Sequence, residues 1–221
     1  MTRWLRRRSG PGWCGPLGEH YFAADPSVPF SRAPVRARVW GHDLAMDSGS
    51  GVFARGRVDV GTAVLLRETM PPGPGRYLDL GCGYGVIGLA IAVAQPGAVV
   101  DAVDVNERAV LLANQNAAAL GVADRFFATT PEGVPPESYD EIWSNPPIRI
   151  GKSALHELLL TWLPRLADGG RAVLVVGKNL GADSLAGWLG EQGFATSRLA
   201  SAKGFRVLET RPEQRGATMR A

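Results

Sequence analysis

The chain has 221 residues, of which 45% are hydrophobic, 8% aromatic and 20% charged. This length and balance predict one globular domain with a substantial core, and they exclude a second full domain as well as collagen-like, coiled-coil and low-complexity architectures. The formal net charge is +3, from 24 Lys and Arg against 21 Asp and Glu, and this small excess permits a nucleic acid or another acidic partner without demanding one.

Cysteine and histidine are scarce, which bears on metals and on the cellular compartment. The two cysteines, Cys14 and Cys82, cannot build a disulfide framework, and the three histidines lack the spacing of zinc ligands. No run of about 18 apolar residues indicates a membrane span, and no apolar stretch follows the basic start as in a secretory signal. We therefore expect a cytoplasmic protein without a metal site and without a membrane segment.

The first residues are basic and lack periodicity. Residues 1 to about 18 combine arginine, glycine and proline, which predicts a flexible arm or an overlong translation start. We expect three parts: a basic, partly flexible segment over 1–34, a folded domain over 35–211 and a flexible tail over 212–221.

In chain order, the folded domain begins with a predicted hairpin. Val35–Trp40 and Asp43–Asp47 alternate apolar and polar residues around a Gly-His turn, as two antiparallel strands do. The glycine- and serine-rich segment 47–56 follows as a flexible loop that carries Phe53. Apolar residues then recur at helical spacing over Val58–Thr69, and the run PPGPG ends that predicted helix.

From residue 76 onward, predicted strands and helices alternate. The strands lie at 76–80, 98–103, 125–128, 139–144 and 172–176. The first two helices lie at 86–94 and from an Asn106 N-cap to Gly121. The third runs through Leu155–Leu166, with a kink at Pro164 and an end at Gly169-Gly170. The fourth runs through Leu185 to Gly193.

The last two predicted strands, 195–200 and 205–210, are joined by only four residues. They must be antiparallel, because a parallel pair needs a crossover of a dozen residues or more. The whole pattern predicts an α/β protein with a Rossmann-like, mostly parallel seven-stranded sheet and a C-terminal antiparallel hairpin.

The first chemical signal is the turn Asp79-Leu-Gly81-Cys-Gly83-Tyr-Gly85 between a strand and a helix. Glycines let the backbone turn tightly and approach a ligand, and the helix start offers free N–H groups. Asp104 ends the next strand, 23 positions beyond Gly81, where its carboxylate can accept both ribose hydroxyls of an adenosine ligand. The alternative is a tight turn with a purely structural role.

Details of the turn favour S-adenosylmethionine over a nicotinamide cofactor. The glycines follow GxGxG, not GxGxxG, and the acidic Asp79 precedes them. A pyrophosphate prefers an anion-friendly turn, whereas an acidic side chain suits a sulfonium cation that carries an ammonium group. Asp79 either contacts that cation or ties the loop together, and both readings stay open.

The second signal is Asn145-Pro146-Pro147, at the end of the fourth parallel strand. Consecutive prolines cannot continue a central strand, so they predict a rigid, exposed turn. The Asn145 side-chain oxygen and the Pro146 carbonyl oxygen are then two fixed acceptors. Acceptors that hold both hydrogens of an amine favour the geometry in which its lone pair points at a methyl group, so positioning and electrostatics replace a strong base. The alternative is a turn that merely ends the strand.

The glycine turn, Asp104 and the string NPPIRIGK (Asn145–Lys152) resemble the class I S-adenosylmethionine-dependent methyltransferases. Among them, the best match is the small methyltransferase domain of the ribosomal RNA small subunit methyltransferase C family, which modifies guanine N2. The resemblance extends over roughly residues 47–210 and implies the class I methyltransferase fold and S-adenosylmethionine as cofactor.

The resemblance also implies roles for particular residues. The implied cofactor-binding residues are Asp79, Gly81, Gly83, Tyr84, Gly85, Asp104, Val105 and Asn145, with Gly61 and Thr62 near the cofactor. The implied catalytic residues are Asn145, Pro146 and Pro147.

Substrate contacts are expected from Phe53, Ile148, Arg149 and Lys152. Position 148 is Ile where many enzymes with this motif have Phe or Tyr, so base stacking must be weaker or come from elsewhere. Phe53 is the candidate replacement, with a simple core aromatic as the alternative. Arg149 and Lys152 either contact phosphates or are solvated surface charges. The long form of the family has two tandem domains, so the basic N-terminal region or a second subunit would supply further substrate grip.

The expected function is therefore methylation of the exocyclic N2 of a guanine, with ribosomal RNA or the small ribosomal subunit as partner, by a monomer or a homodimer. A methyltransferase for a protein glutamine or a small molecule is the alternative. A nicotinamide-dependent dehydrogenase is disfavoured by the terminal hairpin and the Asn-Pro-Pro motif. A catalytically inactive nucleotide-binding module is disfavoured by the intact glycine turn and Asn145.

Overall fold

The computed structural model describes residues 29–213. The expected flexible arm over residues 1 to about 18, most of the expected basic segment over 1–34 and most of the expected tail over 212–221 lie outside the described residues.

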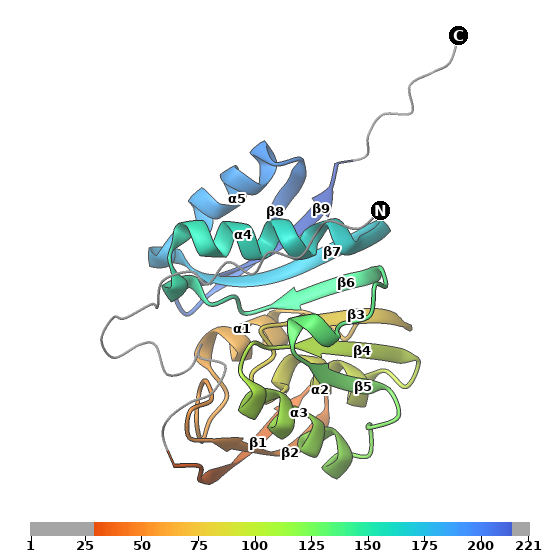
Figure 1. The fold of residues 1–221 in the computed structure, drawn as a ribbon. Coiled ribbons are helices and arrows are strands. Elements are labelled where there is room, and N and C mark those ends of the chain that lie inside the picture. The colour runs from red at the N-terminus through yellow and green to blue at the C-terminus, as the bar shows by residue number, and fades with distance from the viewer. Residues whose placement is uncertain (1–28, 214–221) are drawn as a thin grey trace, which may run out of the picture.

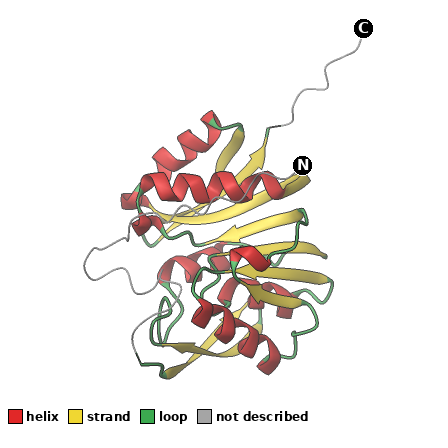
Figure 2. Ribbon diagram, viewed as in Figure 1, coloured by secondary structure: helices red, strands yellow, loops and turns green. Residues whose placement is uncertain are grey.

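Seven strands form one sheet in the order β5-β4-β3-β6-β7-β9-β8 (Figures 1 and 2). Strands β3 to β7 are mutually parallel, whereas β9 pairs antiparallel with both β7 and β8. Strand β8 therefore runs with the parallel set. The mixed seven-stranded sheet with a terminal antiparallel hairpin confirms the predicted fold class. The strands are β3 (Gly75–Leu80), β4 (Ala98–Val103), β5 (Phe126–Thr129), β6 (Tyr139–Ser144), β7 (Leu166–Gly177), β8 (Phe194–Ala202) and β9 (Phe205–Pro212).

Helices cover both faces of this sheet and enclose two hydrophobic cores. One core includes side chains of α1 (Val60–Glu68), α2 (Val86–Ala94) and α3 (Glu107–Ala119), together with the hairpin of β1 (Arg32–Val39) and β2 (His42–Gly49). The other core lies under α4 (Lys152–Trp162) and α5 (Ala182–Glu191). Short 3₁₀ turns complete the chain at η2 (Pro131–Gly133), η3 (Ile148–Ile150), η4 (Leu163–Arg165) and η5 (Lys178–Leu180).

Strand β7 shows why its sequence is an almost unbroken apolar run. Val173 and Val175 belong to the first core, whereas Ala172, Leu174 and Val176 belong to the second. Successive side chains of a strand point to opposite faces, so a strand covered on both faces needs apolar residues at every position.

The end of α4 differs from the prediction. The α-helix stops at Trp162, and a 3₁₀ turn that contains Pro164 follows it, because proline cannot donate to the helix ladder. The predicted end at Gly169-Gly170 is wrong, since these glycines lie within β7. The pairing of β6 with β7 shifts register here, and a Cβ at Gly170 would lie 2.9 Å from the carbonyl oxygens of Ala167 and Asp140. A glycine is needed for this close approach of two backbones.

Candidate functional site

A pocket lies where the carboxyl ends of β3 and β6 meet the start of α1 and the loop after β2. This edge of an open α/β sheet is where ligands bind. The pocket is lined by Phe53, Ala54, Asp59, Thr62, Gly81, Cys82, Gly83, Tyr84, Val86, Ile87 and Asn145.

The three glycines of the turn have different roles. Gly81, Gly83 and Gly85 have φ angles of 74°, 54° and 95°, a left-handed region that favours glycine. A Cβ at Gly81 or Gly83 would meet no described atom within 4 Å, whereas one at Gly85 would lie 3.0 Å from Leu89 Cδ1. Gly81 and Gly83 therefore keep space open beside the pocket, and Gly85 allows the turn to pack against α2.

Asp104 is held in place by backbone N–H groups. Its Oδ2 accepts a hydrogen bond from Gly83 N (2.8 Å), and its Oδ1 accepts one from Asn106 N (2.9 Å). Burial raises the pKa of Asp104, and these bonds from the backbone act in the opposite direction. Because each carboxylate oxygen has two lone pairs, both can still accept from a ligand. Val105, the next residue, is exposed.

Asp79 lies beneath the turn and is not among the pocket-lining residues. Only 1% of its surface is exposed, and its Oδ2 accepts a hydrogen bond from Gly88 N in the first turns of α2 (2.8 Å). Its Oδ1 has no partner among the described residues. Burial raises its pKa to about 7, the Gly88 bond lowers it, and the charge of Asp104 adds a smaller increase. The geometry is that of a side chain tying the turn to α2, and a direct contact with a cofactor stays a prediction.

Asn145 reaches the pocket with its amide group in a defined orientation. Its Nδ2 donates to Asp59 Oδ2 (2.8 Å) and to Thr62 Oγ1 (3.1 Å). A carboxylate only accepts hydrogen bonds, so the amide nitrogen must face Asp59. The side-chain oxygen, Oδ1, then faces away from Asp59, and no described residue donates to it.

Asp59 is a site residue that the sequence reasoning missed. It is the N-cap of α1, and its Oδ2 also accepts from Gly61 N (2.7 Å) and Thr62 N (3.3 Å). An Asp directly before an apolar helical pattern is a signal for an N-cap. Its contact with Asn145, 86 residues further along the chain, has no signal in a single sequence. Thr62, expected near the cofactor, lines the pocket, whereas Gly61 packs against Phe205 instead.

The Asn-Pro-Pro motif forms a tight turn. Pro147 has φ −75° and ψ 73°, the values of an inverse γ-turn, and Pro146 O accepts from Ile148 N at 2.8 Å. Pro146 itself is buried. A carbonyl oxygen has two lone pairs, so Pro146 O retains one acceptor position. The motif thus presents two acceptor oxygens, Asn145 Oδ1 and Pro146 O, after one strand end.

The expected substrate residues differ in whether they line the pocket, pack against a core or face solvent. Phe53 is 43% exposed and lines the pocket, so the alternative of a core aromatic does not hold. Ile148 is half-buried against the core under α4 and α5. Arg149 and Lys152 are exposed beyond the turn. These last three do not line the pocket.

The loop that carries Phe53 is anchored at both of its ends. Asn106 Nδ2 donates to Gly51 O (2.7 Å), and Tyr84 Oη donates to Arg57 O (2.6 Å). Burial, followed by the charge of Asp59, raises the pKa of Tyr84 far above its usual range. The glycine turn and the Phe53 loop are therefore joined through a hydroxyl that stays protonated.

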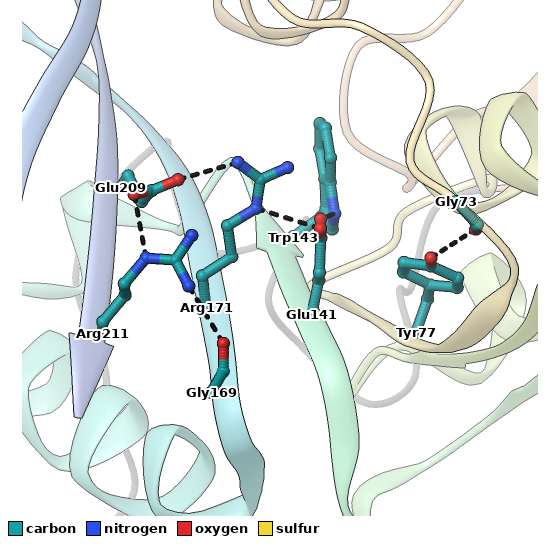
Figure 3. Close-up of polar contacts among 8 residues, drawn as sticks. All are labelled: Gly73, Tyr77, Glu141, Trp143, Gly169, Arg171, Glu209 and Arg211. Carbon is teal, nitrogen blue, oxygen red and sulfur yellow. Dashed lines mark hydrogen bonds and ion pairs between the residues drawn. The ribbon is translucent and has the colours of Figure 1, made fainter. Parts of the chain in front are cut away.

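A second polar cluster lies nearer the amino ends of the strands (Figure 3). Arg171 Nε donates to Glu141 Oε1 (3.0 Å) and Arg171 Nη1 donates to Glu209 Oε2 (2.7 Å), while Arg211 pairs with Glu209 (3.0 Å). The charges compensate one another across β6, β7 and β9, so this cluster links strands and is not a candidate site. Within residues 29–213 there is no group of three metal-ligating side chains and no helix long and apolar enough to cross a membrane.

Comparison with protein families adds a clear match. The model of the methyltransferase small domain family matches residues 43–209. The protein YbxB of Bacillus subtilis, described as uncharacterized, is 32% identical over 202 residues, which cover 88% of this chain and 99% of YbxB.

Ribosomal RNA small subunit methyltransferases C match over shorter parts. The protein from Ectopseudomonas mendocina is 36% identical over 173 residues, or 76% of this chain and 51% of that protein. The chain thus spans about half the length of this relative.

Among solved structures, the Thermus thermophilus 16S rRNA N2 G1207 methyltransferase, in complex with AdoMet and guanosine, superposes with a TM-score of 0.69 at 25% identity. The match covers 85% of this chain and 52% of that one.

Proposed function

The chain belongs to the methyltransferase small domain family and is an S-adenosylmethionine-dependent methyltransferase, and from this premise we propose that it methylates the exocyclic N2 of a guanine in ribosomal RNA. The methylated base and atom are proposed on the Thermus thermophilus 16S rRNA N2 G1207 methyltransferase, and the class of RNA also on the methyltransferase C of Ectopseudomonas mendocina. Because the chain spans only about half the length of these relatives, its substrate is proposed and does not follow from family membership alone.

The pocket and the end of β4 beside it fit the cofactor by their chemistry. Space is open beside Gly81 and Gly83, which a methionine chain can occupy. Asp104 and Val105 are not among the pocket-lining residues, but Asp104 is bonded to the pocket-lining Gly83. From there its carboxylate would accept the ribose hydroxyls, and the exposed Val105 would offer the adenine an apolar surface. When bound, S-adenosylmethionine supplies a methyl group on a sulfonium centre.

The side chain of Asn145 would orient the acceptor. An exocyclic amine is a poor nucleophile because its lone pair is delocalised into the ring. Asn145 Oδ1 and Pro146 O can each accept one of its two hydrogens and favour a pyramidal nitrogen. In transfer, the nitrogen would form a bond to the methyl carbon while the methyl–sulfur bond of the sulfonium breaks and its electron pair stays on sulfur. The nitrogen would then release one proton to solvent, so these residues contribute positioning and electrostatics.

One observation carries this proposal: the hydrogen bonds from Asn145 Nδ2 to Asp59 and Thr62. These bonds turn the amide nitrogen of Asn145 toward Asp59, so that Oδ1 is the atom that meets the substrate. Two oxygen atoms that accept hydrogen bonds select a substrate group with two hydrogens to donate, which is an amine.

The test is transfer of labelled methyl from S-adenosylmethionine to ribosomal RNA and small subunits that lack their modifications, followed by nucleoside analysis. N2-methylguanosine is the expected product, and Asn145→Ala should abolish transfer while cofactor binding, measured by calorimetry, persists. Label in protein or in a small molecule, with none in RNA, would contradict the proposed substrate. Full transfer by Asn145→Ala would contradict the assigned role of Asn145.

A further inference from the structure

We propose that five cations beside the pocket, which we call the basic rim, form a surface that binds the sugar-phosphate backbone of RNA. The proposal rests on the proposed function and adds to it the part of the chain that grips the substrate. The basic rim consists of Arg57, Arg149, Lys152, Lys178 and Lys203.

All three lysines of the chain belong to the basic rim. Lys152 begins α4 after β6, Lys178 begins η5 after β7, and Lys203 lies in the turn between β8 and β9. Strands β6, β7 and β8 run in the same direction (Figure 1). These positions therefore lie on one edge of the sheet, and the pocket lies at the same edge.

Hydrogen bonds and close contacts connect this edge to Asn145 step by step. Asp59 holds Asn145 and caps α1. The next residue but one, Gly61, lies so close to Phe205 that a Cβ would be 3.0 Å from the Phe205 ring. Gly204, beside Phe205, accepts a hydrogen bond from Lys178 N (2.8 Å). Lys178 and Lys203 are therefore near neighbours of the start of α1.

The five cations are exposed and have no ion-pair partner within residues 29–213. Arginines nearer the amino ends of the strands are neutralised instead. These are Arg76 with Asp101, Arg125 with Asp124, and Arg171 and Arg211 with Glu209. Exposed cations without an ion pair in this part of the chain also lie on β1 and β8, at Arg36 and Arg198, but the five of the basic rim gather where the RNA must enter.

Acidic residues limit the basic rim to one half of the sheet edge at which the parallel strands end. Glu107 and Glu132 follow β4 and β5, so the half of this edge formed by β4 and β5 does not favour a polyanion. On the half from β6 to β8, Asp183 is paired with Arg206. Exposed apolar side chains of Val60 and Leu180 lie on the same half, and the exposed Phe53 lies at the pocket. Cations interleaved with apolar groups suit a nucleic-acid strand, whose phosphates and bases alternate.

The experiment measures binding of a fluorescent 20-nucleotide single-stranded RNA of mixed sequence, because backbone contacts are independent of sequence. The test variant is Lys152→Gln/Lys178→Gln/Lys203→Gln. The control, Arg36→Gln/Arg38→Gln/Arg198→Gln, removes the same number of exposed cations from β1 and β8 away from the rim, of which Arg38 is 3.9 Å from Asp43. Calorimetry with S-adenosylmethionine verifies that both variants keep the cofactor site.

We expect the test variant to raise the Kd for RNA at least roughly tenfold at about 0.1 M salt, and to reduce the slope of log K against log salt by up to about 2. The control variant should stay close to the wild type. Equal loss in both variants, or none in the test variant, would overturn the proposal.

Methyl transfer separates this proposal from the proposed function. Normal transfer to RNA by the test variant would overturn the basic rim and leave the function standing. Loss of RNA binding in the test variant alone, with no transfer to RNA by the wild type, would support the rim and overturn the function.

A different observation carries a second inference: the geometry points to Asp59 as a positioning residue for Asn145. It rests on the assigned role of Asn145. Asp59 Oδ2 accepts from Asn145 Nδ2 while it also accepts from Gly61 N and Thr62 N. Turning the Asn145 amide over would place two oxygen acceptors face to face, so the charge of Asp59 selects the orientation that presents Oδ1.

Substitution by serine separates capping from positioning. Serine caps helices about as well as aspartate, but its side chain is shorter and cannot span the distance to Asn145. Asp59→Ser should lower kcat at least roughly tenfold, with KM for RNA, cofactor affinity and melting temperature close to wild type. Asp59→Asn should recover part of kcat, because its amide oxygen can accept from Asn145.

Thr62 supplies an independent pair of variants. Thr62→Val removes the second acceptor of Asn145 at nearly constant volume, and Thr62→Ser keeps it. The inference is overturned by wild-type kcat in Asp59→Ser, or by a loss of cofactor affinity that accounts for the lower rate. If Asn145→Ala itself retains activity, the assigned role of Asn145 fails instead.

Discussion

Asp79 is a carboxyl group that folding places almost wholly out of water. One oxygen is bonded to Gly88 N, and the other has no partner among the described residues. Ionising it in this position is costly, and its pKa of about 7 against an ordinary 3.8 expresses that cost. The residue type was visible as part of the glycine turn, but its burial depends on how α2 packs on the sheet.

A pH dependence of stability follows from this shift. Since the folded-state pKa is raised, the folded chain binds the proton more tightly, and stability falls as pH rises from about 4 to about 7. Asp79→Asn carries no charge and should lack this part of the slope. Its free energy of unfolding relative to wild type should therefore rise between pH 4 and pH 8, by about 1 to 4 kcal/mol.

Urea unfolding of both proteins at several pH values measures this difference. The comparison across pH cancels any constant cost of burying the amide. A difference that does not change with pH would contradict the raised pKa.

Helix α3 holds the hairpin and the glycine turn together through one side chain. Asn116 is 3% exposed; its Oδ1 accepts from Asp47 N (2.8 Å), and its Nδ2 donates to Asp47 O and Tyr84 O (both 2.9 Å). These bonds join β2, α3 and the turn that lines the pocket. The hairpin therefore supports the site from outside the main sheet.

Asn116→Ala should lower the free energy of unfolding by about 2 to 4 kcal/mol, because it leaves buried backbone groups without partners, and it should also weaken cofactor binding. Asn114 offers a matched control on the same helix. Its Nδ2 donates to Ala128 O and its Oδ1 accepts from Ala128 N, as Asn116 does with Asp47, but Asn114 is exposed. Asn114→Ala should cost less and leave cofactor affinity unchanged.

Urea unfolding and calorimetry with S-adenosylmethionine test both variants. Equal effects of the two substitutions on cofactor affinity would show that Asn116 does not support the turn.

At the scale of the whole molecule, charge is distributed unevenly between the two edges of the sheet. Paired arginines and acids, such as the chain from Glu141 through Arg171 to Glu209, link strands nearer the amino ends (Figure 3). Uncompensated cations lie around the pocket edge from β6 to β8. The small net charge of +3 therefore hides a field that favours approach of a polyanion to one side.

Much of the fold was predictable because its signals are local. The helices at 86–94 and after Asn106 were placed correctly, since a cap, a glycine turn and an apolar period act over a few residues. The end of α4 was not, because Gly169 and Gly170 mark a close approach to β6 and not a helix stop.

The same division holds for the site. Motifs and spacing alone pointed to the glycine turn and Asn145, which line the pocket, and to Asp104, whose contact with a cofactor stays a prediction. Each follows a predicted strand whose end must lie on the ligand-binding edge. The partnership of Asp59 with Asn145, the burial of Asp79 and the gathering of the three lysines were decided by the tertiary structure. They depend on contacts between residues far apart in the chain, such as the 86 positions between Asp59 and Asn145, and such contacts arise from the packing of whole elements that no local pattern encodes.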